Sequence, residues 1–197
     1  MIISDKNERS IELVSYSEKK NDEALKEKYL GWLNNPDITK SLASPALLST
    51  DKGPEFIEES FDRFMQEDCI GFFIRYVPDN IFIGTAKLDN ISNYTLSAWD
   101  GIMIGDKDYQ GKGLASEVYR ILLAYAFSEL NLERIATGCN SENIAMIKTF
   151  ERIGYVAEGR FRNADFIDNK FSDHLYFGIL KEEFFKKNSV NFLINRE

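Results

Sequence analysis

The sequence predicts a single α+β domain, a mixed α/β sandwich that spans residues 1–197. Three observations lead to this class. Helical patterns come first, a series of strand patterns follows, and strands then alternate with helices. The chain of 197 residues has 44% apolar and 28% charged residues, which suits one domain with a sizeable core. No repeat, low-complexity segment or linker divides it.

The N-terminal third has the patterns of one strand and two helices. Residues 11–14 predict a short strand, and residues 22–35 predict a helix because their apolar side chains recur at helical spacing. Residues 41–54, "SLASPALLSTDKGP", have the composition of a loop. A second helix is predicted over residues 54–66, with its aromatic and aliphatic side chains on one face.

The rest of the chain alternates between strand and helix patterns. Apolar runs bounded by turn residues predict strands, and apolar residues at helical spacing predict two further helices. In chain order these are a strand at 70–77, a turn at 78–80, strands at 81–88 and 96–105, a long helix beginning near Gly113, a strand at 134–140, a helix at 143–152 closed by Gly154, and strands at 155–163 and 174–180 joined through a turn at Asp168 and Asn169.

The composition argues against several classes of function. A net charge of −8 disfavours binding to nucleic acid or to anionic membranes. No segment approaches the ~20 continuous apolar residues of a membrane span, and the first residues lack the features of a secretory signal. We therefore expect a cytoplasmic protein. An acidic surface suits a cationic partner such as an amine, although solubility alone also explains it.

The supply of metal ligands and nucleophiles is small. Cys69 and Cys139 are far apart and form no CxxC pair, so neither a disulfide framework nor a metal site is indicated. His174 is the single histidine, which argues against a zinc enzyme and a Ser-His-Asp hydrolase. We expect chemistry that relies on carboxylates, hydroxyls and backbone groups.

A glycine-rich stretch precedes the longest apolar helix, in "DYQGKGLASEVYRILLAYAF" from residue 108 to residue 127. Gly111 and Gly113 have no Cβ, so a ligand can come close to the backbone. The start of the helix presents unpaired N–H groups and the positive end of its dipole, and Lys112 adds a charge. Together they predict a phosphate site. The P-loop and dinucleotide fingerprints are absent, and a tight helix entry without a ligand is the alternative.

The stretch Gln110-x-x-Gly113-x-Ala115 resembles the acyl-CoA loop of the GCN5-related N-acetyltransferases (GNAT). Other segments resemble the branch of that family that acetylates the N-termini of ribosomal proteins. They are "YLGWLNNPDITKSL", "AWDGIMIGDKDYQGKGLASE", "RIATGCNSENIAMIKTFERIGYVAEGRFRN" and "HLYFGILKEEF", and they occur in the expected order over nearly the whole chain.

The resemblance implies a mostly antiparallel central sheet that is splayed at its middle and flanked by helices, with acetyl-CoA in the opening. It implies that the backbone of the strand at 98–105 pairs with the pantetheine arm, and that the loop amides hold the pyrophosphate. Asn143, with Asn140 as a second candidate, would contact the pantetheine arm, although a helix cap is the ordinary role of such residues. The implied cofactor-binding residues are Ile102, Met103, Ile104, Gln110, Gly111, Lys112, Gly113, Leu114, Ala115, Ser116, Asn140 and Asn143.

Acetyl transfer to an amine needs a base for the amine's proton and benefits from an acid for the thiolate. Asp100 stands where relatives often carry a glutamate base, and burial beside Trp99 would raise its pKa. The alternative is that Asp100 faces solvent or holds a strand edge. Many relatives carry a tyrosine acid where this chain has Phe150, so we consider Tyr176, a water, or no acid at all. His174 is a further candidate for proton relay.

The predicted function is acetyl-CoA-dependent N-acetylation of a primary amine without a metal ion. The acceptor is a small-molecule amine, an amino sugar or a protein N-terminus, and Trp32 and Asp100 are the predicted acceptor contacts. The absence of the usual donors at Met146 and Phe150 supports a different class, a CoA-binding sensor or interaction module without catalysis. A homodimer is expected from the family likeness alone.

Overall fold

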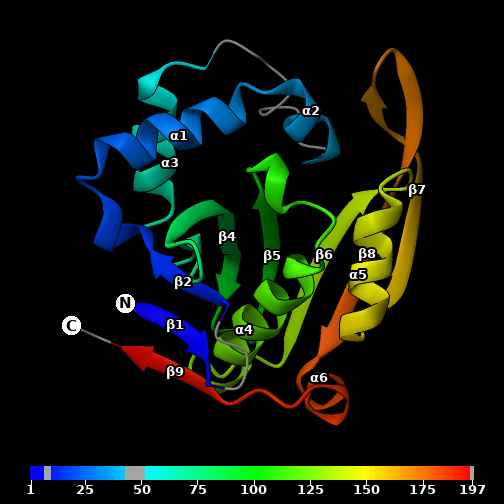
Figure 1. The fold of residues 1–197 in the computed structure, drawn as a ribbon. Helices are drawn as coiled ribbons and strands as arrows, with labels where there is room; N and C mark the ends of the chain where they lie inside the picture. The colour runs from blue at the N-terminus through cyan, green and yellow to red at the C-terminus, as the bar shows by residue number, and fades with distance from the viewer. Residues whose placement is uncertain (7–9, 43–51, 196–197) are drawn as a thin grey trace.

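The computed structural model describes residues 1–6, 10–42 and 52–195. Within these ranges nine strands form one sheet in the order β7-β8-β6-β5-β4-β3-β2-β1-β9 (Figure 1). The strands are β1 (Ile2–Asp5), β2 (Ile11–Ser15), β3 (Ile70–Tyr76), β4 (Ile81–Ser92), β5 (Ser97–Ile104), β6 (Arg134–Asn140), β7 (Val156–Ile167), β8 (Lys170–Leu180) and β9 (Phe192–Asn195). The single mixed α+β domain expected from the sequence is confirmed.

Helices cover both faces of the sheet. They are α1 (Glu23–Leu33), α2 (Pro36–Thr39), α3 (Pro54–Arg63), α4 (Leu114–Ser128), α5 (Ile144–Ile153) and α6 (Lys181–Lys187). Successive strand residues point to opposite faces, and Phe72 and Ile102 lie in the core with α4 and α5, whereas Phe73 and Met103 pack with α1 and α3. None of these helices combines the length and apolar character needed to cross a bilayer.

The sheet opens between its two middle strands. β5 and β6 run parallel and pair only at Ser97–Arg134, Ala98–Ile135 and Trp99–Ala136. Every other neighbouring pair of strands in the sheet is antiparallel. Beyond Trp99 and Ala136 the two strands separate, which confirms the splayed, mostly antiparallel sheet. This opening places the candidate site.

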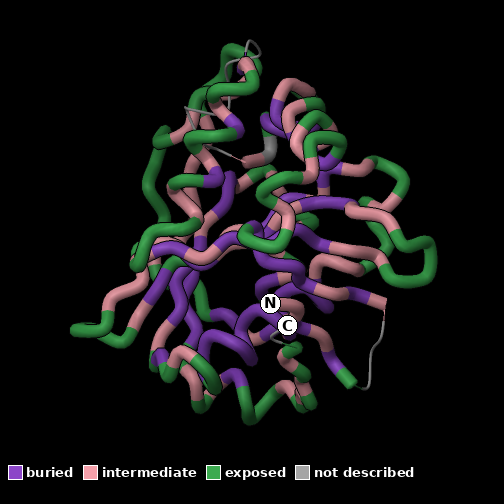
Figure 2. Tube along the Cα trace, turned by 90° about the vertical axis from the view of Figure 1, so that its left-hand side faces the viewer, coloured by how far each residue is buried: buried purple, intermediate pink, exposed green. Residues whose placement is uncertain are grey.

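The core beneath the opening is continuous. Buried backbone runs through the sheet and α4, and exposed backbone lies in the outer loops (Figure 2). Glu117, in the first turn of α4, is buried and accepts hydrogen bonds from the Ile11 N–H at 3.0 Å and the Ser10 hydroxyl at 2.5 Å. It ties the helix to β2, so the start of α4 is held firmly against the sheet.

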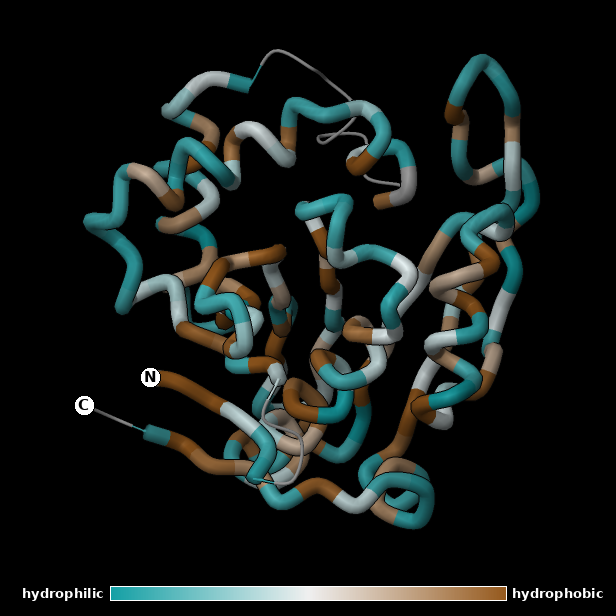
Figure 3. The backbone as a smooth tube through the Cα atoms, viewed as in Figure 1, coloured by the Kyte–Doolittle hydropathy of each residue, from teal (hydrophilic) through white to brown (hydrophobic). Residues whose placement is uncertain are grey.

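Several elements differ from the sequence prediction. β1, β9, α2 and α6 were not predicted, and α3 ends at Arg63 rather than at residue 66. β1 and β9 are short, pair with each other and are largely apolar (Figure 3). The hairpin of β7 and β8 is longer than predicted because β7 is exposed along most of its length and so lacks an apolar alternation. Most of the loop predicted at 41–54 falls on residues 43–51, outside the described residues.

Candidate active site

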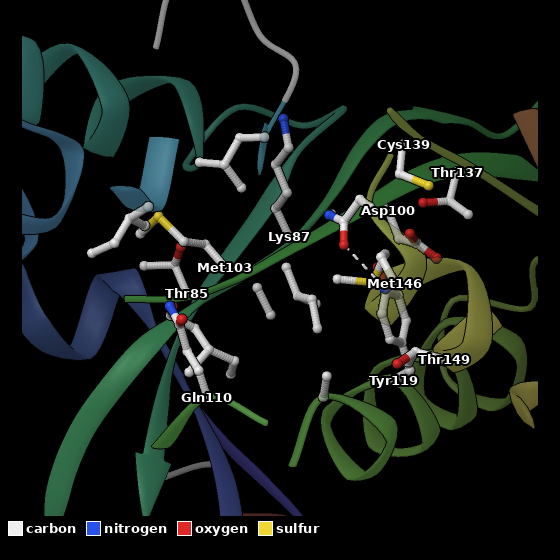
Figure 4. A pocket seen from close by; sticks show the side chains of 18 of the residues that line it. Thr85, Lys87, Asp100, Met103, Gln110, Tyr119, Thr137, Cys139, Met146 and Thr149 are labelled. Carbon is white, nitrogen blue, oxygen red and sulfur yellow. Dashed lines mark hydrogen bonds between the residues drawn. The ribbon is translucent and has the colours of Figure 1, made fainter. Parts of the chain in front are cut away.

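A cavity of about 920 Å³ fills the opening between β5 and β6 and continues beneath α1, α2 and α3. Around the opening its walls come from β4, β5, the glycine loop, α4, β6 and α5, and beyond the opening they come from the first three helices. Figure 4 shows labelled side chains of β4, β5, the glycine loop, α4, β6 and α5 around the opening. One cavity therefore connects the predicted phosphate loop with a second chamber under the N-terminal helices.

The glycine loop needs its glycines for backbone conformation. Gly111 and Gly113 have φ angles of 71° and 81°, in the left-handed region that other residues rarely adopt. A Cβ on either residue would meet no atom within 4 Å, so the protein's own packing does not require glycine there. Gly113 is the N-cap of α4, whose first turn has N–H groups without intrahelical acceptors. The loop is therefore open to a ligand beside a helix N-terminus.

Most of the predicted cofactor-binding residues line this cavity. They are Ile102, Met103, Ile104, Gln110, Gly111, Gly113, Leu114, Ala115 and Asn143. The Gln110 side chain donates a hydrogen bond to the Ile104 carbonyl at 2.7 Å and so fastens the loop to β5. Asn143 caps α5, because its side-chain oxygen accepts from the Met146 N–H at 3.1 Å. Asn143 therefore has the helix-capping role that is ordinary for such a residue, and it also lines the cavity.

Three predicted cofactor-binding side chains point elsewhere. The Lys112 ammonium lies over the Tyr109 ring, 4.9 Å from its centroid. The buried Ser116 hydroxyl accepts from Arg152 at 3.3 Å. Asn140 donates to Asp165 at 3.0 Å and to Ser172 at 2.5 Å, on the β7–β8 side of β6. None of the three lines the cavity.

Asp100 lies at the apex of the opening. It is the first residue of β5 beyond the last β5–β6 pair, and Thr137 is the corresponding residue of β6. Both side chains are buried, at 8% and 2% exposure, and both line the cavity. The Tyr155 hydroxyl donates to Oδ2 of Asp100, whereas buried Oδ1 meets no hydrogen-bond partner of ordinary geometry among the described residues.

Burial makes the Asp100 carboxyl weakly acidic. Desolvation raises its pKa to about 7, against the lowering effect of the hydroxyls of Tyr155, Thr137 and Tyr119. A carboxyl with such a pKa exchanges its proton near neutral pH, which suits a general base. The solvent-facing alternative for Asp100 is therefore wrong. Its carboxyl is buried as expected, but beside Tyr119 and Tyr155 and not beside Trp99, which is 41% exposed.

The other predicted catalytic and acceptor residues do not line the cavity. Tyr176 and His174 project from the face of β8 opposite its core residues, and their ring centroids are 4.8 Å apart. His174 Nδ1 lies 3.0 Å from Asp165, and its ring stands over Gly138, a residue of the cavity wall. Trp32 is buried against Gly105, where a Cβ would meet the indole at 2.3 Å, so its place is structural.

Five side chains around Asp100 and the glycine loop were not predicted from the sequence, Tyr155 among them. Tyr119 and Thr137 bring hydroxyls to Asp100 from α4 and β6, and both line the cavity. Lys148 and Arg152, four residues apart on one face of α5, also line it. The i, i+4 spacing of these two cations on α5 was visible in the sequence, and Arg152 donates to Ser116 at the start of α4. In the sequence, Tyr119 and Thr137 have the spacing of ordinary core residues of a helix and a strand.

Comparisons with known proteins agree with this architecture. Residues 18–156 match the model of the acetyltransferase (GNAT) domain. The uncharacterized N-acetyltransferase YnaD of Bacillus subtilis is 41% identical over 39% of this chain and 45% of that protein. The putative ribosomal N-acetyltransferase YdaF of Bacillus subtilis is 32% identical over 53% of this chain and 57% of that protein. These alignments span about half the length of either relative.

The fold also matches solved structures. A spermidine N-acetyltransferase from Vibrio cholerae, solved in complex with CoA and spermine, superposes with a TM-score of 0.78 over 90% of this chain and 99% of that one, at 22% identity. Such identity supports the fold. The family model covers more than half of the chain, and it includes the glycine loop, the apex residue Asp100 and the helix α5. The chain therefore belongs to the GNAT family of acetyltransferases.

Proposed function

We propose that the protein transfers an acetyl group from acetyl-CoA to a primary amine by direct attack within a ternary complex. The observation that carries this proposal is the single cavity that runs from the glycine loop, past the buried carboxyl of Asp100, to the chamber under α1–α3. A donor entering at the loop and an acceptor entering from the chamber would meet at the apex. Holding both in line supplies much of the rate gain.

The residues of the glycine loop fit the pyrophosphate of acetyl-CoA. Gly111 and Gly113 leave open the space that a Cβ would occupy, and the first turn of α4 offers N–H groups to an anion. Lys148 and Arg152 add positive charge from α5. The exposed backbone of β5 beyond Trp99, where β6 has left it, would pair with the amides of the pantetheine arm.

The reaction needs one base and gains from one hydroxyl. The amine nitrogen attacks the thioester carbonyl carbon, its proton passes to Asp100, and the C–S bond breaks to release CoA as the thiolate. Tyr119 is the tyrosine at the apex, and burial raises its pKa well above 10.0, so it stays protonated and able to donate. We therefore assign the donor role to Tyr119 in preference to Tyr176 or His174.

The acceptor class and the assembly belong to the same proposal. The name of YdaF, a putative ribosomal N-acetyltransferase, supports a ribosomal acceptor, and the spermidine enzyme supports a small amine. The branch that modifies ribosomal proteins remains a prediction. A homodimer would cover the exposed aromatic side chains of the β7–β8 hairpin.

The alternative, a CoA-binding module without catalysis, rests on Phe150, which is a core residue here, 5.6 Å from the Tyr119 ring.

Calorimetric titration with acetyl-CoA, paired with turnover assays, tests the proposal. We expect micromolar binding and release of CoA in the presence of an amine. Gly113→Ala should weaken binding on the order of tenfold or more, because a Cβ intrudes on the pyrophosphate and the left-handed backbone is strained. Gly154→Ala is the matched control, with a φ of 115° at the end of α5 away from the cavity lining. Binding without turnover of any amine would favour the non-catalytic module, and no binding would refute both.

A further inference from the structure

The part of the cavity beyond the apex has a chemistry of its own. We name it the acceptor chamber and define it by the residues that line it from η1 (Tyr16–Lys19), α1, α2, α3 and the position directly after α3. They are Tyr16, Tyr29, Leu33, Ile38, Phe56 and Phe64. Tyr16 stacks on Phe61 and Phe73 with ring centroids 4.7 and 4.4 Å apart, and Phe64 meets its edge at 4.9 Å. The walls are therefore aromatic and held in place by packing.

Polar groups in the chamber walls are mostly uncharged. The hydroxyls of Tyr16 and Tyr29 lie close enough to interact with one another, and Thr85 and Ser60 lie near Tyr16 and Tyr29 respectively. Thr85 and Ser60 also line the cavity. Such hydroxyls can orient a polar atom of a ligand, but they do not neutralise a buried positive charge.

Two cations face the cavity on this side. Lys87 covers Gly101, next to the apex, and its ammonium lies 3.0 Å from Asp89 and 5.9 Å from the centroid of the Phe64 ring. Arg63 binds Asp68 at 2.6 Å and also pairs with Asp89. Lys87 and Arg63 line the cavity, whereas the two carboxylates that balance them do not. A ligand in the chamber therefore meets the positive partner of each pair.

Carboxylates among the described lining residues are at the two ends of this space. Asp100 is at the apex, where the reacting amine must lie. Asp37 is at the exposed rim, where it already pairs with Lys107 at 2.7 Å and Lys40 at 3.6 Å. A polyamine would place its second and third ammonium groups between these ends, beside the positive charges of Lys87 and Arg63. Burying a charge without a partner is strongly unfavourable.

From this arrangement we infer that the acceptor is a monoamine with an apolar body about the size of an aromatic ring, and not a polyamine. The inference rests on the proposed function. The apolar body would occupy the acceptor chamber and gain from burial against its rings. The positive charge of Lys87 would favour the neutral form of the amine, which is the form that attacks. The specificity would then differ from that named for the structurally similar spermidine enzyme.

Steady-state acetylation of 2-phenylethylamine and spermidine with saturating acetyl-CoA tests the inference. We expect kcat/KM to favour 2-phenylethylamine on the order of tenfold or more. A preference for spermidine, or turnover of neither amine, overturns the inference. If the protein still acetylates another amine, such as glucosamine or an N-terminal peptide, the proposed function survives that result. If it acetylates nothing, both fail.

A charge reversal makes the test specific to the chamber. Lys87→Glu should shift the ratio of kcat/KM values towards spermidine on the order of tenfold, because a carboxylate replaces the repelling cation. Lys186→Glu, on exposed α6, is the matched control and should leave the ratio unchanged. Lys87→Gln should shift the ratio of kcat/KM values in the same direction but by less. It replaces Lys87→Glu in the test if the glutamate variant does not fold. A ratio unmoved by both Lys87 variants would overturn the electrostatic part of the inference.

Discussion

Asp100 is the residue on which most of the chemistry depends. Its pKa of about 7 means that the carboxylate fraction grows as the pH rises through neutrality. We therefore expect kcat/KM to rise with pH through about 7 in the wild-type protein. Asp100→Asn should lose roughly 10²–10⁴-fold in kcat/KM and should keep only the rise that comes from free amine. Asp168→Asn, at the hairpin turn with a φ of 50°, is the control, because asparagine tolerates that backbone. An Asp100→Asn protein with a wild-type profile would remove the base assignment.

Asp100→Asn should lower the activity but raise the free energy of unfolding. Burial raises the pKa of Asp100 in the folded chain above the ordinary aspartate value of 3.8, so the folded state binds the proton more tightly than the unfolded state. Stability is then greatest below about pH 4 for this group and falls as the pH rises to about 7. Asp100→Asn should therefore gain stability over the wild type by up to about 4 kcal/mol at pH 8 and much less at pH 5. Denaturant unfolding at the two pH values measures the difference. An equal effect at both would contradict the raised pKa.

The donor assignment distinguishes two tyrosines. Tyr119 lies at the apex with its hydroxyl near Asp100, whereas Tyr176 projects from another face of β8 and packs on Trp99 with centroids 5.9 Å apart. Tyr119→Phe should lower kcat by roughly 10- to 100-fold with little change in the dissociation constant of acetyl-CoA. Tyr176→Phe should leave kcat near the wild-type value. The opposite ranking would return the role to Tyr176.

Sequence reasoning found the residues of this site that carry a local signature. Gly111 and Gly113 precede a helix within a few positions, and Asp100 interrupts an apolar strand, so each is visible in a short window. Tyr119 and Thr137 come from α4 and β6, and Tyr155 lies just before β7. They meet at Asp100 through tertiary packing. Each has the spacing of an ordinary core residue. Their common position was not readable without the fold.

At the scale of elements, α5 contributes charge to the loop that α4 begins. Arg152 lines the cavity and donates to Ser116 in the first turn of α4 at 3.3 Å. Arg152→Gln should weaken acetyl-CoA binding by roughly tenfold at low ionic strength, and by less at high salt because screening reduces the phosphate attraction. Arg162→Gln, on exposed β7, is the control. Titrations at two salt concentrations check both variants, and a loss that does not depend on salt would point to packing instead.

The helices and strands differ in how closely their positions can be predicted from the local sequence. The strands at the middle of the sheet and helix α4 have long apolar runs, and their positions were predicted closely. β7 has exposed side chains on both faces over much of its length, so neither a two-residue period nor a buried run marks it. β1 and β9 are four-residue strands. β9 pairs with β1, and β1 also pairs with β2. Their structure depends on partners distant in the chain.

At the scale of the whole molecule, the β7–β8 hairpin carries exposed aromatic side chains that no other element of the described fold covers. β7 is an edge strand, and Phe161, Phe166 and Phe171 on the hairpin are 59%, 52% and 60% exposed. Figure 1 shows the hairpin projecting beyond α5, at the end of the sheet away from β9. An unpaired edge that carries aromatic side chains favours association with another chain. This surface is where we expect the second copy of a homodimer to bind.

Sedimentation velocity tests that expectation with a pair of edge variants. The wild-type protein should sediment at twice the monomer mass at micromolar concentration. The double variant Phe166→Ser and Phe171→Ser should shift it towards the monomer, because the two rings, 4.8 Å apart, would lose their cover. Leu193→Ser, 40% exposed on the opposite edge strand β9, should leave the dimer intact. A monomeric wild type would mean that the hairpin stays uncovered at these concentrations, and a dimer lost only in the Leu193 variant would place the interface at the other end of the sheet.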